Sequence, residues 1–112
     1  MSPRAARQIR ICRLETGGWH EVLEIPNTAQ GLYDALDGYA EPIRLPPELY
    51  DRHLVGLVDE DGLARALPLN PYSPRLGLGP LVGPVLIARS SVPDFVSLTD
   101  DDVAAIEAWL GK

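Results

Sequence analysis

The sequence predicts an α+β fold, in which a mostly antiparallel sheet of five to six strands carries two short helices packed on one face. Three observations predict this fold. Short segments with alternating apolar residues follow one another along the chain, separated by turns that contain glycine and proline. Only two segments, near residues 28–37 and 99–110, repeat apolar residues at helical spacing. The length of 112 residues suits one compact domain, so we expect residues 1–112 to form a single domain.

A hairpin is predicted near the start of the chain. Apolar residues nearly alternate with polar ones in segments 8–15 and 19–25, which is typical of strands. The sequence Thr16-Gly17-Gly18 between them provides a turn, so the two strands should pair antiparallel. Residues 1–7 precede the hairpin and are expected to be flexible.

The first helix should occupy residues 28–37. Asn27 or Thr28 can accept hydrogen bonds from the unpaired amides of the first helical turn. Gly38 suits the left-handed backbone conformation that ends many helices. The apolar face of this helix consists of Leu32, Ala35 and Leu36.

Strands and turns should alternate in the middle of the chain. Pro42 removes a backbone donor, which argues for an edge position or a bulge in the strand that contains it. An acidic turn, Asp59-Glu60-Asp61-Gly62, should connect two strands. The strands expected here are residues 39–45, 54–58 and 63–67, with one helical turn at residues 48–52.

Residues 68–80 are rich in proline and are expected to form an ordered loop. Each proline removes a backbone donor, so a long regular element is not expected there. The apolar run at residues 81–88 is interrupted by Gly83-Pro84 and fits a buried strand with a bulge. The residues Ser90 to Pro93 that follow are interpreted as loop.

The C-terminal helix, residues 99–110, has the strongest signals. Thr99 should cap it, with Asp102 at the third helical position, and the acidic residues of the first turn favour the positive end of the helix. Gly111 should end it. The apolar stripe consists of Val103, Ile106 and Leu110.

Charge and cysteine content restrict the function. The net charge is −6, and from Glu15 onward 16 acidic residues face six basic ones, so direct binding of nucleic acid is not expected. No stretch approaches ~18 apolar residues, so we expect no membrane contact. Cys12 has no partner for a disulfide, which favours a cytoplasmic location.

Catalytic chemistry is not indicated. Cys12 could act as a nucleophile only beside a histidine, and the alternative is a small buried side chain on a strand. His20 and His53 are the only histidines, and their spacing matches no zinc pattern. The acidic turn lacks the further ligands of a calcium loop. We therefore expect no catalytic residue, no metal and no cofactor, and we predict that the chain is not an enzyme.

The candidate binding residues are aromatic and polar side chains on loops. Tyrosine and arginine on ordered loops are typical of contact surfaces. The alternative is that Asn70 caps the loop backbone and Tyr72 fills the loop interior. The candidates for a partner-binding patch are Tyr39, Asn70, Tyr72 and Arg75.

Five motifs occur in an order that resembles one protein family, the domain of unknown function 3846. The resemblance covers about residues 20–110. It supports the α+β fold and implies a small accessory protein of bacteriophages, plasmids or bacteria, with no established activity. This chain has Asp37 where the family usually has glycine and Pro84 where it usually has threonine. The motifs are Ile25-Pro26-Asn27-Thr28, Asp37-Gly38-Tyr39, Leu67-Pro68-Leu69-Asn70, Leu81-Val82-Gly83-Pro84-Val85-Leu86-Ile87 and Phe95-Val96-Ser97-Leu98-Thr99-Asp100.

Three functions are compatible with these observations. The first is an accessory protein that binds an unidentified protein partner and modulates host machinery. The second is an acidic decoy that mimics nucleic acid. The third is a small hydrolase or ligand-sequestering protein, which would need a pocket that joins Cys12, a histidine and an acid. A homodimer is also expected to be possible, because strands bounded by proline leave sheet edges available.

Overall fold

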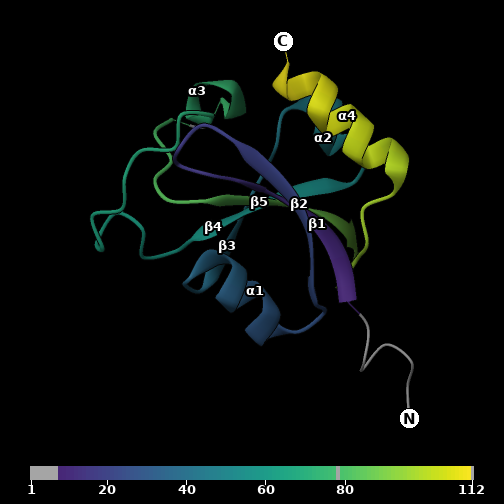
Figure 1. Cartoon of the computed structure of the whole chain (residues 1–112), viewed down its shortest axis with the longest axis horizontal. Coiled ribbons are helices and arrows are strands. Elements are labelled where there is room, and N and C mark those ends of the chain that lie inside the picture. The colour runs from purple at the N-terminus through teal and green to yellow at the C-terminus, as the bar shows by residue number, and fades with distance from the viewer. Residues whose placement is uncertain (1–7, 78, 112) are drawn as a thin grey trace.

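The computed structural model describes residues 8–77 and 79–111, so the expectation for residues 1–7 lies outside the described residues. Figure 1 shows a central sheet with helices around it. The elements are β1 (Gln8–Leu14), β2 (His20–Pro26), α1 (Ala29–Leu36), β3 (Ala40–Ile43), α2 (Pro47–Tyr50), β4 (Leu54–Asp59), α3 (Ser73–Leu76), β5 (Val85–Ser91), β6 (Asp94–Val96) and α4 (Asp100–Leu110).

The predicted sheet is confirmed: it has six strands, all paired antiparallel, which places the chain in the α+β class. The strand order is β2-β1-β5-β4-β3, and β6 pairs with β5. The predicted N-terminal hairpin forms, with β1 and β2 in continuous register from Gln8–Pro26 to Leu14–His20. The sheet therefore ends at β2 on one side and at β3 on the other, and Pro42 lies on an edge strand as predicted.

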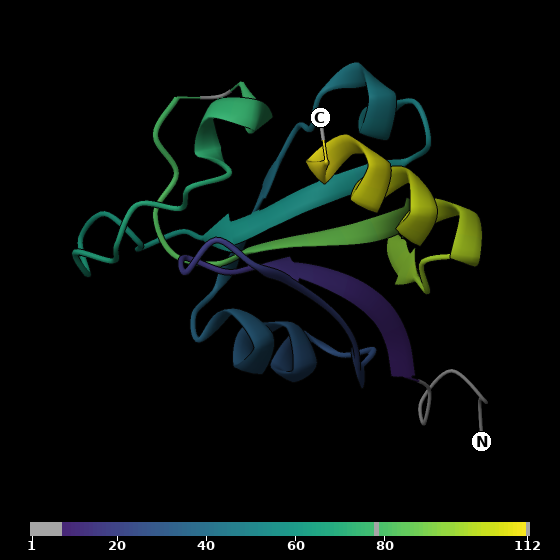
Figure 2. The ribbon, with the colours of Figure 1, turned by 45° about the horizontal axis from the view of Figure 1, so that its top comes forward.

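The helices cover both faces of the sheet, and the expectation that they share one face is wrong (Figure 2). Helix α1 packs on one core cluster, which includes Ile11, and α4 packs on a second cluster, which includes Cys12. The physical reason lies in the strands. Successive residues of β1 are buried on opposite faces, and all four residues from Val85 to Ala88 are fully buried. A sheet that is apolar on both faces must be covered on both.

The N-terminal capping signals are confirmed at the two longer helices, but the left-handed residue at the end of α1 is Asp37 and not Gly38 as predicted. The Thr28 hydroxyl accepts a hydrogen bond from the amide of Gly31 at the start of α1. Thr99 and Asp102 form a reciprocal capping box at the start of α4. Among the described residues, no helix is long and apolar enough to cross a membrane.

The expected strand at residues 63–67 does not form. The chain makes successive turns there, in which the amide of Arg65 donates to the Asp61 carbonyl and the amide of Leu67 donates to the Gly62 carbonyl. The Arg65 guanidinium pairs with the buried Asp59 carboxylate. This ion pair folds the segment back against the end of β4, so it has no neighbouring strand to pair with.

Two further segments are more ordered than the sequence indicates. The proline-rich segment contains α3, and Leu69 forms an isolated bridge with Val82. Of the residues expected to be loop, Ser90 and Ser91 belong to β5, and Val92-Pro93 form the turn into β6, which pairs with the end of β5.

Candidate functional site

Asn70, one of the predicted binding residues, is fully buried and holds the backbone together. Its Nδ2 donates hydrogen bonds to the carbonyl oxygens of Leu14, at 3.0 Å, and Gly83, at 2.9 Å. Its Oδ1 accepts from the amide of Tyr72 at 2.9 Å. These contacts satisfy three buried backbone groups and leave no exposed surface of Asn70 for a partner.

Tyr72 and Arg75 also make contacts that hold the proline-rich segment in place. The Tyr72 hydroxyl donates to the carbonyl oxygen of Gly18 at 2.9 Å, and its half-buried ring packs against the core. The Arg75 Nη1 donates to the carbonyl oxygen of Trp109 at 3.0 Å, near the end of α4. Both side chains therefore connect this segment to other elements.

Tyr39, another of the predicted binding residues, is mostly exposed, with 65% of its surface open to solvent. Its ring meets that of Tyr33 edge to face, with centroids 4.9 Å apart and planes at 71°. The two rings line a hollow of about 490 Å³, which we call the tyrosine pocket. The residues around it are Ala29, Gln30, Leu32, Tyr33, Tyr39, Ala40 and Glu60.

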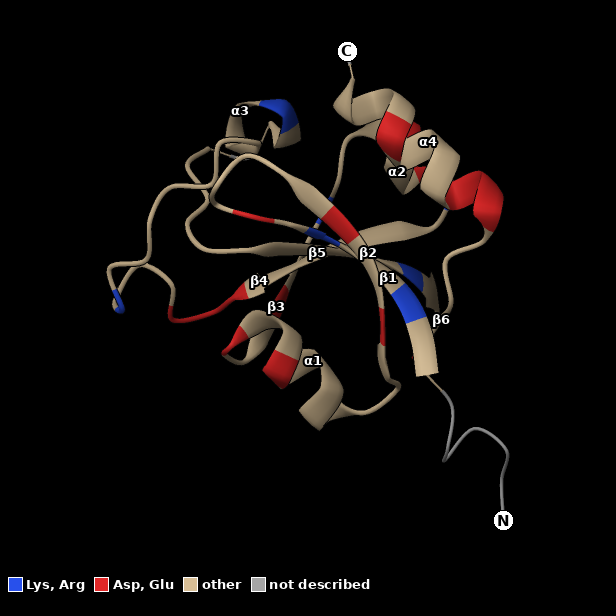
Figure 3. Ribbon diagram, viewed as in Figure 1, with Lys and Arg blue, Asp and Glu red and all other residues tan. Residues whose placement is uncertain are grey.

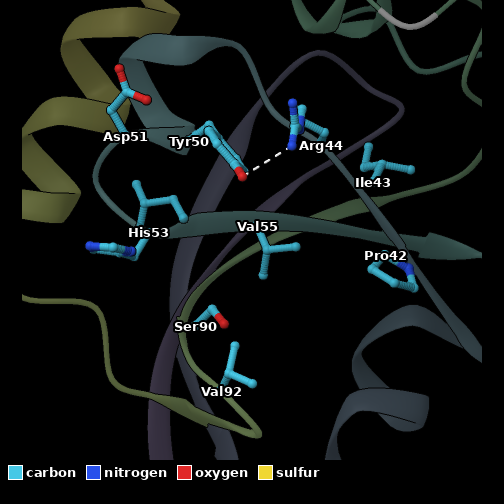
Figure 4. A pocket seen from close by; sticks show the side chains of 10 residues that line it. Pro42, Ile43, Arg44, Tyr50, Asp51, His53, Val55, Ser90 and Val92 are labelled. Carbon is cyan, nitrogen blue, oxygen red and sulfur yellow. Dashed lines mark hydrogen bonds between the residues drawn. The ribbon is translucent and has the colours of Figure 1, made fainter.

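A larger hollow of about 700 Å³ lies at the other end of β3, and we call it the β3 groove (Figure 4). Most of its lining is apolar. It is lined by Pro42, Ile43, Arg44, Tyr50, Asp51, His53, Leu54, Val55, Ser90 and Val92.

The wall of the β3 groove is formed by Arg44 and Tyr50. The chain leaves the sheet after Ile43, turns at Pro46-Pro47 and returns through α2, which brings Tyr50 back beside Arg44. The guanidinium carbon lies 4.3 Å from the centre of the tyrosine ring, and Nη2 donates to the phenol oxygen at 3.0 Å. This arrangement orients both side chains while leaving 45% of the surface of Tyr50 exposed.

The floor of the groove results from unequal strand lengths. Strand β3 pairs with β4 only as far as Ile43 and Gly56, so Leu54 and Val55 extend beyond it. The turn after β5 supplies Val92, 89% of whose surface is exposed. Leu54 is buried, but the half-buried Val55 and the exposed Val92 leave apolar surface open to solvent beside two oriented polar side chains.

Both hollows include residues of β3 in their lining. Ala40 lines the tyrosine pocket and Pro42 lines the β3 groove, and alternation in a strand places these two residues on the same face. We call the two hollows together the β3 surface. Of the residues that line the β3 surface, Tyr39 is the one that the sequence predicted as a binding residue. Arg44 and Tyr50 could have been suspected only from the proline pair that reverses the chain between them.

Two described side chains that could act as nucleophiles, Ser90 and Cys12, lack the contacts that activation requires. Ser90, His53 and Asp51 all line the groove, but no hydrogen bond joins any two of them, and the imidazole of His53 points away from Ser90 in Figure 4. Cys12 is fully buried in the core, and burial together with the charge of Glu107 raises the pKa of its thiol to about 12. The thiol is therefore protonated and inaccessible at neutral pH.

The remaining buried charges serve folding. Burial raises the pKa of Asp102, but hydrogen bonds with Thr99 and the ion pair with Arg89 outweigh this effect, so its pKa is lowered. Its carboxylate accepts from Arg89 at 2.9 and 3.0 Å and from Arg52 at 3.2 Å. The pair of His20 and Glu107, at 2.9 Å, is by contrast solvent-exposed. In residues 8–77 and 79–111, no group of three or more histidine, cysteine, aspartate or glutamate side chains could hold a metal ion.

Comparison with known proteins identifies one family. The family described as a domain of unknown function (DUF3846) matches residues 9–111. No curated protein and no solved structure matches the chain.

Proposed function

The chain belongs to the DUF3846 family, a domain of unknown function, and on this premise we propose that it is a non-enzymatic accessory protein that binds another protein through the β3 surface. The resemblance to accessory proteins of bacteriophages and plasmids makes a component of the host machinery the expected class of partner. A single free cysteine fits action in the cytoplasm.

One observation carries this proposal: the Arg44–Tyr50 pair stands beside apolar surface of Val55 and Val92 that is open to solvent. Tyrosine and arginine are enriched where protein interfaces gain most of their binding energy, because each combines a large contact area with directed polar groups. The cation–π contact and the hydrogen bond hold both side chains in place, so little conformational entropy is lost when a partner binds. The exposed rings of Tyr39 and Tyr50 extend the contact area along β3.

The acidic-decoy function has less support. A decoy needs carboxylates gathered on one surface, as phosphates are along a duplex. Figure 3 shows acidic residues in α1 and in α4, which cover opposite faces of the sheet. Asp59 and Asp102 are moreover buried beside arginines.

A capture experiment tests the proposal. The tagged chain, its Tyr50→Ala variant and its Trp19→Ala variant are incubated with lysate of the encoding organism. Trp19 is a matched control because its ring is also about half exposed, at 51%, but it lies at the β2 end of the sheet. We expect one protein to bind the unmodified chain and Trp19→Ala, and to bind Tyr50→Ala at least about tenfold less. Equal capture by all three would exclude the β3 groove as the binding site.

A further inference from the structure

Strand β2 forms one edge of the sheet, and its hydrogen-bonding directions follow from the contacts of the hairpin. The amide of Glu15 donates a hydrogen bond to the carbonyl of Trp19. In every second residue from Trp19 onward, the backbone amide and carbonyl therefore point toward β1. A contact of β1 is consistent with this pattern. The carbonyl of Arg10 accepts a hydrogen bond from the amide of Leu98, on the side of β1 that faces away from β2. The residues of β2 whose amides and carbonyls point outward, away from the sheet, are His20, Val22 and Glu24.

This outer edge is open. Within residues 8–77 and 79–111, no other backbone or side-chain group hydrogen-bonds the outward amides and carbonyls of these three residues. The edge on the opposite side of the sheet differs, since Pro42 in β3 has no amide to donate. Strand β2 meets a proline only at its last residue, Pro26. It is therefore the better template for an additional strand.

We propose that β2 pairs with β2 of a second copy of this chain, antiparallel and centred on Val22, to form a continuous sheet across a two-fold axis. In this register Val22 lies opposite Val22 of the second copy, and His20 lies opposite Glu24. All outward amides and carbonyls of the three residues then find partners.

The side chains of β2 are self-complementary in this register. His20, Val22 and Glu24 share one face of the strand, so each His20 meets the Glu24 carboxylate of the other copy. The Nε2 atom of His20 bonds Glu107 of its own chain at 2.9 Å, and the protonated form of the imidazole can also donate from Nδ1 to the Glu24 carboxylate of the second copy. Glu24 is exposed and is paired in register with Arg10 of its own chain. A shift of the register by four residues would place Glu24 opposite Glu24 or His20 opposite His20, so charge favours the centred register over these two.

Light scattering coupled to size exclusion, at micromolar protein concentration, tests the dimer. The Val22→Pro variant removes only an outward amide, because the amide of Val22 does not bond β1. We expect a dimer for the unmodified chain and a monomer for Val22→Pro, with unchanged circular dichroism. A monomeric unmodified chain would overturn the proposal.

Oxidative cross-linking tests the register and does not depend on the proline variant folding. With diamide as oxidant, Val22→Cys should form a covalent dimer, because paired Cα atoms across an antiparallel ladder are ~5.5 Å apart. Glu24→Cys should cross-link at least about tenfold more slowly, since Glu24 faces His20 and lies several ångströms from its own copy. Cys12 is fully buried and does not compete. Equal cross-linking of the two variants, or none by Val22→Cys, would exclude this pairing.

Discussion

The side-chain amide of Asn70 donates a hydrogen bond to the backbone carbonyl of Leu14, at 3.0 Å, and so ties the proline-rich segment to strand β1. Because the same amide also reaches Gly83, one side chain joins three segments that are far apart in the sequence.

Replacement of Asn70 should destabilise the fold. The Asn70→Ala variant leaves two buried carbonyls and the amide of Tyr72 without partners, so we expect the free energy of unfolding to fall by about 2–4 kcal/mol. Urea denaturation measures this loss. The control is Leu69→Ala, whose side chain is mostly exposed and should cost less than about 0.5 kcal/mol. Similar costs for the two variants would contradict the role of Asn70.

Gly38 is required because the Asp59 carboxylate lies against it. A Cβ at this position would lie 2.5 Å from Cγ of Asp59, so Gly38→Ala must displace a buried, ion-paired side chain. We expect a loss of about 1–3 kcal/mol in thermal or urea unfolding. At Gly111 a Cβ would make only ordinary contacts, the closest at 3.5 Å, so Gly111→Ala should change stability little. If Gly38→Ala left the stability unchanged, the Asp59 side chain would be free to move out of the way.

Asp102 should make stability depend on pH in the acidic range. Its pKa in the folded state is lowered from the ordinary value of 3.8, so the unfolded state takes up its proton first as the pH falls. The contribution of Asp102 to the free energy of unfolding is therefore fully present above pH ~4. It is lost as the pH falls toward the lowered pKa of the folded state. Unfolding curves at several pH values should show that Asp102→Asn costs about 2 kcal/mol or more at neutral pH and less in acid.

Asp101 provides the control for this titration. It lies in the same helical turn but is exposed, so Asp101→Asn should leave the slope of stability against pH nearly unchanged. Equal reductions of the slope of stability against acidic pH by Asp101→Asn and Asp102→Asn would contradict this account. The buried ion pairs with Arg89 and Arg52 would then not be the source of the pH dependence.

The thiol of Cys12 should be unreactive in the folded protein. Burial raises its pKa to about 12, so little thiolate is present at pH 8, and the side chain has no exposed surface. An aromatic disulfide reagent should label Cys12 at the rate of unfolding, with complete labelling in denaturant. Rapid labelling without denaturant would reopen the possibility of thiol chemistry.

The sequence predicts the elements whose signals are local. The N-terminal hairpin follows from alternation and the glycine turn, and α4 follows from the Thr99 capping box. The apolar run Val85–Ala88 predicts a buried strand, but the placement of the helices on both faces of the sheet depends on packing and is not a local signal. The error therefore concerned how elements pack.

Long-range contacts set the features that the sequence did not predict. Segment 63–67 is apolar enough for a strand but has no neighbour, because Arg65 is held by Asp59. The β3 groove depends on β3 ending before β4 and on Tyr50 returning to Arg44. No local pattern encodes such a meeting, whereas Tyr39 was predicted as a tyrosine on a loop, directly after the expected end of the first helix.

Site-specific photo-cross-linking measures most directly whether the β3 surface binds a partner. A benzophenone side chain replaces Tyr39, Tyr50 or, as a control, the exposed Ala104 of α4, and each protein is irradiated in lysate of the encoding organism. The account predicts one cross-linked host protein at Tyr39 and Tyr50 that is absent at Ala104. Cross-links that are equal at all three positions, or confined to Ala104, would contradict it.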